Sequence, residues 1–418
     1  MALDVLMTIG GFILAFLFSF IFAIFVIIMV SYFKKVPKPD FSPKISIVIP
    51  CYNEEKNIAR CLDSIFSSSY PADKFGVVVV DDGSTDSTLK VLRDYQKRHK
   101  FKVVSESHKG KSECLNRGVM EAKHDFILTL DADTVLTRDC IHKIVQPFYD
   151  DAVGATNGSC LALNNKSFWG IFQGIEYHYN NLIRKSFSDL FNNAIWFFGA
   201  FACYRRDVLE KIGYFKKDTL AEDMDTALSL YSKGYRIVNV HDAIVYTKVP
   251  STFLGLFKQR IRWWAGVLMS LNKNKHLFSK KSDPSILFLF FNQYWWSFYA
   301  VISFPLIAYQ FSYWLPFNMA TFFDLFSYTF RWFSLLGPVV VLYMIPEWGI
   351  SSYSIFGVLS GLLSAFLIVN ALYMFNDRLT FRNAFAIFFY FPYTIVLNSI
   401  IVISLIRLIL PKKRYFMY

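Results

Sequence analysis

Long stretches without a charged residue constrain this chain more than any other feature. They comprise 29 residues between Asp4 and Lys34, 40 between Asp283 and Asp324, 29 between Glu347 and Asp377, and 24 between Arg382 and Arg407. A helix needs about 20 mostly apolar residues to cross a bilayer, so each stretch is long enough for one span. A fifth, weaker candidate covers 321–346. The sequence predicts an N-terminal transmembrane anchor over 1–36 and about four transmembrane helices over 284–410.

Basic residues beside these stretches predict the orientation. No Lys or Arg precedes the first span, whereas four lysines follow it: Lys34, Lys35, Lys38 and Lys44. Cytoplasmic flanks are normally the more basic ones. We therefore expect a multi-pass protein of the cell (plasma) membrane, with its N-terminus outside and its middle region and basic 411–418 tail in the cytoplasm. With four C-terminal spans, the 377–382 loop with its basic Arg378 and Arg382 would face outside, against this rule, unless it is an interfacial segment.

The net charge of +12 has the same explanation, because many of the lysines lie next to the spans. Such residues interact with anionic lipid headgroups, so the charge indicates a lipid bilayer as partner and requires no nucleic acid. Hydrophobic residues make up 54% of the 418 residues and charged residues only 18%. A soluble domain has about 25% charged residues, which excludes a purely soluble protein.

Between the spans, β-branched runs alternate with helical patterns across residues 44–250. Strands are expected at 45–49, 77–80, 101–105 and 126–130, and helices at 55–66, 86–98, 111–122, 166–187 and 222–232. Alternating strands and helices indicate a doubly wound α/β domain with a mostly parallel sheet. The following 251–283 segment predicts an amphipathic helix at the membrane interface.

Polar clusters follow directly after three of the expected strands. They are Asn53-Glu54, Asp81-Asp82 and the pair Asp131 and Asp133. In an open parallel sheet the carboxyl ends of the strands line the ligand crevice, so these groups should converge on one cleft. Helix capping would account for some of them, but it does not explain why carboxylates gather where they repel one another. A divalent cation would relieve that repulsion.

Together the motifs resemble family 2 glycosyltransferases, the GT-A nucleotide-diphospho-sugar enzymes, from about residue 44 to residue 268. The ordered motifs are Ile49-Pro50-Cys51-Tyr52-Asn53-Glu54, Val80-Asp81-Asp82-Gly83-Ser84, Gly110-Lys111-Ser112, Asp131-Ala132-Asp133, Glu222-Asp223 and Gln259-Arg260-Ile261-Arg262-Trp263. The last motif, with its flanking spans, is similar to that of membrane-integrated synthases of poly-N-acetylglucosamine, chitin and cellulose. The resemblance implies a GT-A α/β domain with a mixed, mostly parallel sheet, joined to an α-helical transmembrane bundle.

The resemblance also implies roles for individual residues. The nucleotide-binding positions are Pro50, Tyr52, Glu54, Asp81, Asp82, Lys111 and Asp131. Asp133, with Asp131, is expected to bind Mg²⁺ or Mn²⁺. For Lys111 the alternative is a solvated residue at the start of a helix.

Catalysis is expected at Glu222 and Asp223, with Asp223 as the general base that takes the proton of the acceptor hydroxyl. The family's Thr-Glu-Asp motif reads Ala221-Glu222-Asp223 here, and the alternative is a helix N-terminus rich in acidic residues. Acceptor or diphosphate contacts are expected from Gln259, Arg262, Trp263 and Gly199. The 197–200 stretch around Gly199 could instead be a buried strand.

The favoured interpretation is an inverting enzyme that transfers a sugar, GlcNAc or Glc, from a UDP-sugar donor to a growing β-linked glycan and extrudes the polymer across the membrane. The alternative is a non-processive enzyme that adds one sugar to a lipid acceptor, as ceramide glucosyltransferases do. A non-enzymatic membrane scaffold or transporter is a third class. The sequence leaves open whether a protein partner subunit is needed.

Overall fold

A single eight-stranded sheet organises the α/β region of the computed structural model, which describes residues 2–34, 39–164, 166–314, 322–332 and 334–410. Its strands are β1 (Ile45–Cys51), β2 (Phe75–Asp81), β3 (Lys102–Ser105), β4 (Phe126–Leu130), β5 (Val135–Leu136), β6 (Val153–Ala162), β7 (Phe201–Arg205) and β8 (Arg236–Thr247). The predicted tail over 411–418 and two of the flanking lysines, Lys35 and Lys38, lie outside the described residues.

The strands lie in the order β3-β2-β1-β4-β7-β6-β8-β5. The β1–β2, β1–β4, β2–β3 and β6–β8 pairs are parallel. The β4–β7, β6–β7 and β5–β8 pairs are antiparallel. The mixed, mostly parallel sheet predicted from the sequence is confirmed, and the antiparallel β7 lies in its middle.

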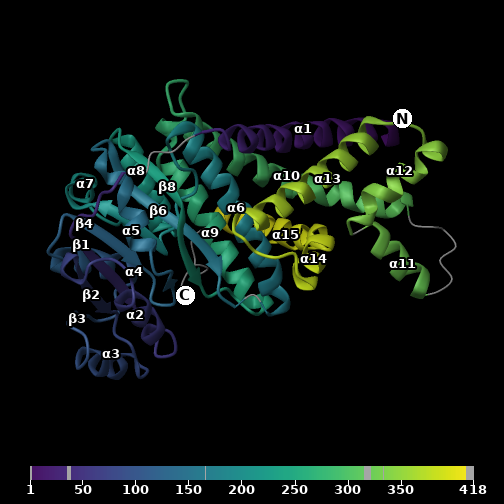
Figure 1. The fold of residues 1–418 in the computed structure, drawn as a ribbon. Helices are drawn as coiled ribbons and strands as arrows, with labels where there is room; N and C mark the ends of the chain where they lie inside the picture. The colour runs from purple at the N-terminus through teal and green to yellow at the C-terminus, as the bar shows by residue number, and fades with distance from the viewer. Residues whose placement is uncertain (1, 35–38, 165, 315–321, 333, 411–418) are drawn as a thin grey trace.

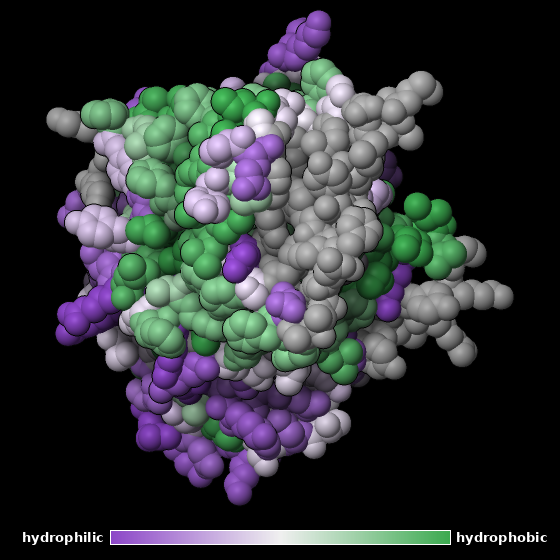
Figure 2. Space-filling view, turned by 90° about the vertical axis from the view of Figure 1, so that its right-hand side faces the viewer, coloured by the Kyte–Doolittle hydropathy of each residue, from purple (hydrophilic) through white to green (hydrophobic). Residues whose placement is uncertain are grey.

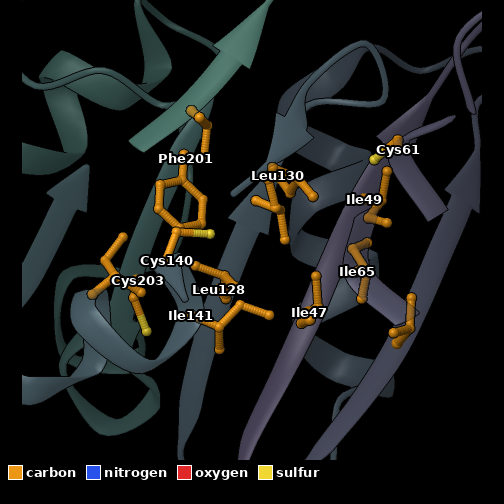
Figure 3. Packing of buried hydrophobic residues seen from close by; sticks show 14 of the residues in the cluster. Ile47, Ile49, Cys61, Ile65, Leu128, Leu130, Cys140, Ile141, Phe201 and Cys203 are labelled. Atoms are coloured by element: carbon orange, nitrogen blue, oxygen red, sulfur yellow. The ribbon is translucent and has the colours of Figure 1, made fainter. Parts of the chain in front are cut away.

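Helices cover both faces of the sheet (Figure 1). On one face lie α2 (Ile58–Phe66), α3 (Thr88–Gln96) and α5 (Cys140–Val145), and on the other α4 (Lys111–Glu121), α7 (Arg206–Ile212) and α8 (Glu222–Ser232). Short 3-10 turns occur at η1 (Ala72–Lys74), η2 (Gln146–Tyr149) and η3 (Lys275–Leu277). Side chains alternate along β1, so Ile47 and Ile49 pack on the face covered by α2, α3 and α5, and Val48 packs on the opposite face. Figure 3 shows the core on the first of these faces, in which Ile47 and Ile49 lie near Ile65 and Leu128.

Two further helices connect the sheet to the rest of the chain. The first, α6 (Phe168–Phe191), packs on β6 and β8 and also against α1 (Ala2–Ser31) and α13 (Ser352–Met374). The second, α9 (Phe253–Lys273), packs against α8 and α15 (Tyr390–Ile409). Both helices therefore lie between the α/β domain and the helical end of the molecule.

The helical end contains α1, α13 and α10 (Pro284–Trp314) side by side, with α11 (Phe322–Trp332) and α12 (Leu336–Trp348) farthest from the sheet (Figure 1). The Tyr32 hydroxyl, just after α1, donates to Asn370 of α13 at 2.7 Å. The ring centroids of Phe18 and Phe356 lie 5.7 Å apart farther along the same two helices. Thus α1 and α13 run parallel, both towards the α/β domain. In this view α10 leads away from that domain.

Three described helices are long and apolar enough to cross a membrane: Thr8–Ser31, Ser354–Met374 and Tyr390–Ile409. The helix α10 has 31 residues but is not among them, and it buries polar side chains such as Asn292 and Gln293. Hydrophobic residues cover much of the upper part of the face in Figure 2, while hydrophilic residues gather at the bottom of that view, at the height of the α/β domain in Figure 1. These features suggest membrane association, and the predicted number of spans stays a prediction.

The 377–382 loop lies on the side of the α/β domain. Asp377 is 3.5 Å from His178 of α6, and the adjoining α14 (Phe381–Phe388) also packs on α6. The side of a membrane on which this loop lies stays a prediction, as does the alternative that it is an interfacial segment.

Candidate active site

The predicted polar residues gather at the carboxyl ends of three neighbouring strands. Pro50 lies within β1, and Tyr52 and Glu54 follow it. Asp81 ends β2, while Asp131 directly follows β4. Because β2, β1 and β4 are adjacent and parallel, their ends meet at one edge of the sheet.

The two acidic residues after β2 have different surroundings. Asp82 accepts hydrogen bonds from the backbone N–H groups of Lys109, at 2.7 Å, and Gly110, at 3.0 Å. This holds the turn before α4, in which Gly110 adopts φ +93°, a conformation that suits glycine. Asp81 is fully buried, and its Oδ1 has no hydrogen-bond partner among the described residues. Asp81 thus keeps one buried, unpaired acceptor oxygen at the end of β2, whereas Asp82 fixes the conformation of the turn that leads to Lys111.

Lys111 is not a solvated helix start. Its Nζ lies 2.8 Å from Asp131 Oδ1 and 3.2 Å from Glu222 Oε1, so it joins the strand end to α8. Burial alone would lower the pKa of Lys111, but the Asp131 and Glu222 carboxylates raise it above its ordinary value. Lys111 therefore stays protonated between the two acidic motifs.

Asp133 lies in a concentration of negative charge. Burial, followed by the charges of Asp131 and Glu54, raises the pKa of Asp133 to about 6. The Thr247 hydroxyl at the end of β8 lies 3.4 Å from its Oδ1.

Among the described residues, no group of three or more His, Cys, Asp or Glu side chains could hold a metal ion by itself. One or two carboxylates together with substrate phosphates are, however, a common set of Mg²⁺ ligands. Asp131 and Asp133 therefore fit a cation that is bound together with a diphosphate.

Asp223 lies in the first turn of α8, and its carboxylate is held by two backbone donors. Gly199 N–H donates to Oδ2 and Met224 N–H to Oδ1, each at 2.7 Å. Burial and the neighbouring Glu222 nevertheless raise the pKa of Asp223 to about 6. A carboxyl group with such a pKa can act as a general base near neutral pH.

Gly199 lies in a loop directly before β7, so the alternative of a strand over 197–200 is wrong. A Cβ atom on Gly199 would lie 2.7 Å from the Asp223 Cβ and 3.0 Å from its Oδ2. Glycine therefore permits the close approach of this loop to the carboxylate.

A cavity of about 360 Å³ connects these groups with α9. Of the predicted site residues, its lining includes Lys111, Asp131, Asp133, Gly199, Glu222, Asp223, Gln259, Arg262 and Trp263. The α9 residues in this set follow an N-cap in which Thr252 Oγ1 accepts from Gly255 N–H. The other predicted residues, Pro50, Tyr52, Glu54, Asp81 and Asp82, are absent from the lining and lie at the adjacent strand ends.

The cavity also extends to the helical end of the molecule. Gln293 of α10 and three residues of α15, Leu397, Ile400 and Ile401, line it. Gln293 is 4% exposed, and its Nε2 has no hydrogen-bond partner among the described residues. The carboxylates and the long helices thus border one continuous space.

Sequence reasoning missed a buried ion pair in this lining. Arg260 Nη2 donates to Glu176 Oε2 at 2.9 Å, and Tyr393 donates to the same oxygen at 2.6 Å. The pair joins α9, α6 and α15. In the sequence, the glutamate among the apolar residues of 166–187 was the one sign of this ion pair. Which residue pairs with Glu176 depends on tertiary packing and could not be predicted. Lys248, directly after β8, also lines the cavity and was missed.

Ala221, which stands where the family's motif has threonine, lies at a close contact between α8 and α9. A Cβ atom on Gly266 of α9 would lie 2.8 Å from both the Cβ and the backbone N of Ala221. A larger residue at position 221 would add atoms at this contact. The small pair therefore lets α9 pass close to the start of α8, next to Asp223.

Comparisons with known proteins agree with this architecture. Residues 43–266, more than half of the chain, match the model of the glycosyltransferase like family 2. A poly-β-1,6-N-acetyl-D-glucosamine synthase of Staphylococcus epidermidis is 32% identical over 224 residues, which cover 53% of this chain and 54% of that protein. The enzyme of the same name from Staphylococcus aureus is 30% identical over 235 residues, 55% of this chain and 57% of that protein. The chain thus spans little more than half the length of these curated relatives.

Among solved structures, the mannosyltransferase PcManGT from Pyrobaculum calidifontis, solved with GDP-Man and Mn²⁺, has a TM-score of 0.61 and 22% sequence identity. The similarity covers 97% of this chain and all of that one. At this identity the likeness supports the GT-A fold.

Proposed function

The chain belongs to the glycosyltransferase like family 2, and from this premise we propose that it transfers GlcNAc from UDP-GlcNAc to the end of a growing β-linked polysaccharide. The observation that carries the proposal is the single cavity that joins Asp131, Asp133 and Asp223 to α10 and α15. The names of the staphylococcal relatives favour GlcNAc as the sugar.

In this proposal the strand ends bind the nucleotide. The buried, unpaired Oδ1 of Asp81 would accept a hydrogen bond from a donor group of the uracil, and the exposed Tyr52 ring offers a face for stacking. Glu54 contributes a further carboxylate beside this site. Asp131 and Asp133 hold Mg²⁺ or Mn²⁺, which when bound would neutralise charge on the diphosphate.

The transfer requires the acceptor hydroxyl to lose its proton as its oxygen attacks the anomeric carbon. Asp223 takes that proton, while the bond from the anomeric carbon to the UDP oxygen breaks. Attack from the face opposite the leaving group inverts an α-linked donor and gives a β linkage. Lys111 and Arg262 supply positive charge beside the leaving diphosphate.

The acceptor occupies the part of the cavity nearest α9 in this proposal. Trp263 offers an aromatic face to a sugar ring, and Gln259 Oε1 has no hydrogen-bond partner among the described residues. Farther along, the buried Gln293 amide suits the hydroxyl groups of a glycan, since an unpaired polar group against an acyl chain is unfavourable. This favours a polymer acceptor over the lipid of the alternative function. A multi-pass topology with the α/β domain in the cytoplasm and the N-terminus outside completes the proposal.

The test is to incubate the purified protein in nanodiscs with Mg²⁺ or Mn²⁺ and a panel of UDP-sugars, and to measure UDP release. We expect the highest rate with UDP-GlcNAc. Faster turnover of another sugar would overturn the choice of donor, and no UDP release from any donor would contradict the glycosyltransferase activity itself.

A further inference from the structure

The middle of α6 contains a fully buried arginine, Arg184. No carboxylate pairs with its guanidinium group among the described residues. The acidic residues of the helix are engaged elsewhere, Glu176 with Arg260 and Asp189 with Lys185. A buried charge without a counter-ion is costly unless its hydrogen bonds are satisfied, so its contacts indicate what holds it in place.

Neutral groups surround the guanidinium. Nη1 donates to Asn181 Oδ1 at 2.9 Å and Nη2 to the Gly158 carbonyl of β6 at 3.2 Å. Nε donates to the Trp196 carbonyl at 3.1 Å, and Cζ lies 4.1 Å from the centroid of the Phe198 ring. Arg184 thus ties α6 and the sheet to the 196–198 segment.

That segment has an unusual backbone. Trp196 adopts φ +39°, in the left-handed region that bulky residues rarely occupy. Such a conformation persists only where surrounding contacts hold it. The hydrogen bond from Arg184 to the carbonyl of this residue, together with its contact to the Phe198 ring, supplies two such contacts.

The same segment leads directly to the proposed catalytic base. Residues 196–200 all line the cavity, and Gly199 N–H donates to Asp223 Oδ2 at 2.7 Å. We propose that Arg184 is a positioning residue, which holds the 196–198 segment so that Gly199 N–H stays on the Asp223 carboxylate. This inference rests on the proposed function and assigns it a residue outside all of the sequence motifs.

The proposal makes a prediction that differs from simple destabilisation. Loss of the Gly199 hydrogen bond would remove a contact that favours the charged form of Asp223, so the acid limb of the pH–rate profile should move to higher pH. The nucleotide-binding strand ends should be little affected. We therefore expect Arg184→Met to lower kcat at least tenfold, to leave KM for the UDP-sugar near its original value and to shift the acid limb upward. Arg184→Lys retains a donor and should recover part of the kcat.

Arg206→Met is the matched control. The Arg206 guanidinium likewise makes three hydrogen bonds, to the backbone carbonyls of Val119, Ala122 and His124, but none of these residues lines the cavity. Its substitution should lower thermal stability without moving the acid limb or lowering kcat as strongly.

UDP release by the unmodified protein is measured first, because its absence would contradict the proposed function and not this inference. With an active protein, an unchanged kcat and acid limb in the Arg184 variants would overturn the positioning role. Equal changes in the Arg206 control would overturn it as well, since the effect would then be one of general stability. If Arg184→Met does not fold, Arg184→Lys decides by the same two readouts.

Discussion

At the scale of single residues, the most informative group is Asp223. As the proposed general base, its carboxylate has to be charged to accept a proton, and burial and Glu222 raise its pKa to about 6. Activity should therefore be full well above pH 6 and fall as the pH drops through this value, by about tenfold per unit.

Asp223→Asn should lower kcat by about 10²–10⁴-fold, the usual contribution of a general base.

The control for this substitution is Asp207→Asn. Asp207 is exposed on α7 and pairs with Lys211 at 2.8 Å, away from the cavity. It should retain both the rate and the acid limb. A fully active Asp223→Asn variant would contradict the assignment of the base.

The two carboxylates after β4 predict a metal requirement. Chelation with EDTA should abolish UDP release, and added Mg²⁺ or Mn²⁺ should restore it. Asp133→Asn should raise the metal concentration needed for half-maximal activity, because one of few protein ligands loses its charge. Unchanged activity after thorough chelation would contradict a metal-bound diphosphate.

Local sequence predicts the acidic residues of the sheet edge well, since Asp81, Asp82, Asp131 and Asp133 lie at or just after the end of a buried strand within a recognisable motif. It does not predict which oxygens remain available. Asp81 and Asp82 are adjacent in sequence, yet the backbone N–H groups of the turn at Gly110 donate to Asp82 and leave Asp81 Oδ1 unpaired. Arg184 was equally hidden, because its partners come from β6 and from the loop before β7.

At the scale of elements, the contact between α8 and α9 decides the geometry of the site. The close approach of Gly266 to Ala221 brings the Gln-x-x-Arg-Trp helix beside Asp223. Gly266→Ala should force the helices apart and cost about 1–3 kcal/mol of stability, as overpacking commonly does. We expect a lower Tm in detergent and a reduced kcat.

Gly76→Ala is a suitable comparison, since its new Cβ would meet His124 at 3.6 Å, an ordinary contact distance. It should change the Tm and kcat much less. A Gly266→Ala variant as stable and active as the unmodified protein would contradict the importance of this contact.

The elements themselves were largely predictable from periodicity, as the early strands and helices show. The role of α6 was not, because an aromatic-rich amphipathic pattern is typical of both membrane-surface and internal helices. Its buried Arg184 and the ion pair of Glu176 depend on residues far along the chain. Such contacts cannot be inferred from a local pattern.

At the scale of the whole molecule, the cavity links the chemistry to the helical end. If a growing glycan passes Gln293, removing that amide should hinder elongation more than the first transfer. Gln293→Leu should therefore shorten the product while early UDP release stays near its original rate. Products of unchanged length would contradict a path along α10.

Span counting was the least secure use of the sequence, because charge-free length does not distinguish a spanning helix from a buried one. The helix α10 illustrates this, since it is charge-free along its 31 residues yet buries Asn292 and Gln293. The mixed α/β domain, in contrast, followed from alternation and motif order.

The central claim is that one cavity serves both transfer and elongation. The most direct measurement is the size of the product formed from radiolabelled UDP-GlcNAc by the purified protein in nanodiscs. The account predicts a high-molecular-weight, glycosidase-sensitive polymer that is absent with Asp223→Asn. A product that remains one sugar long on a lipid would contradict it.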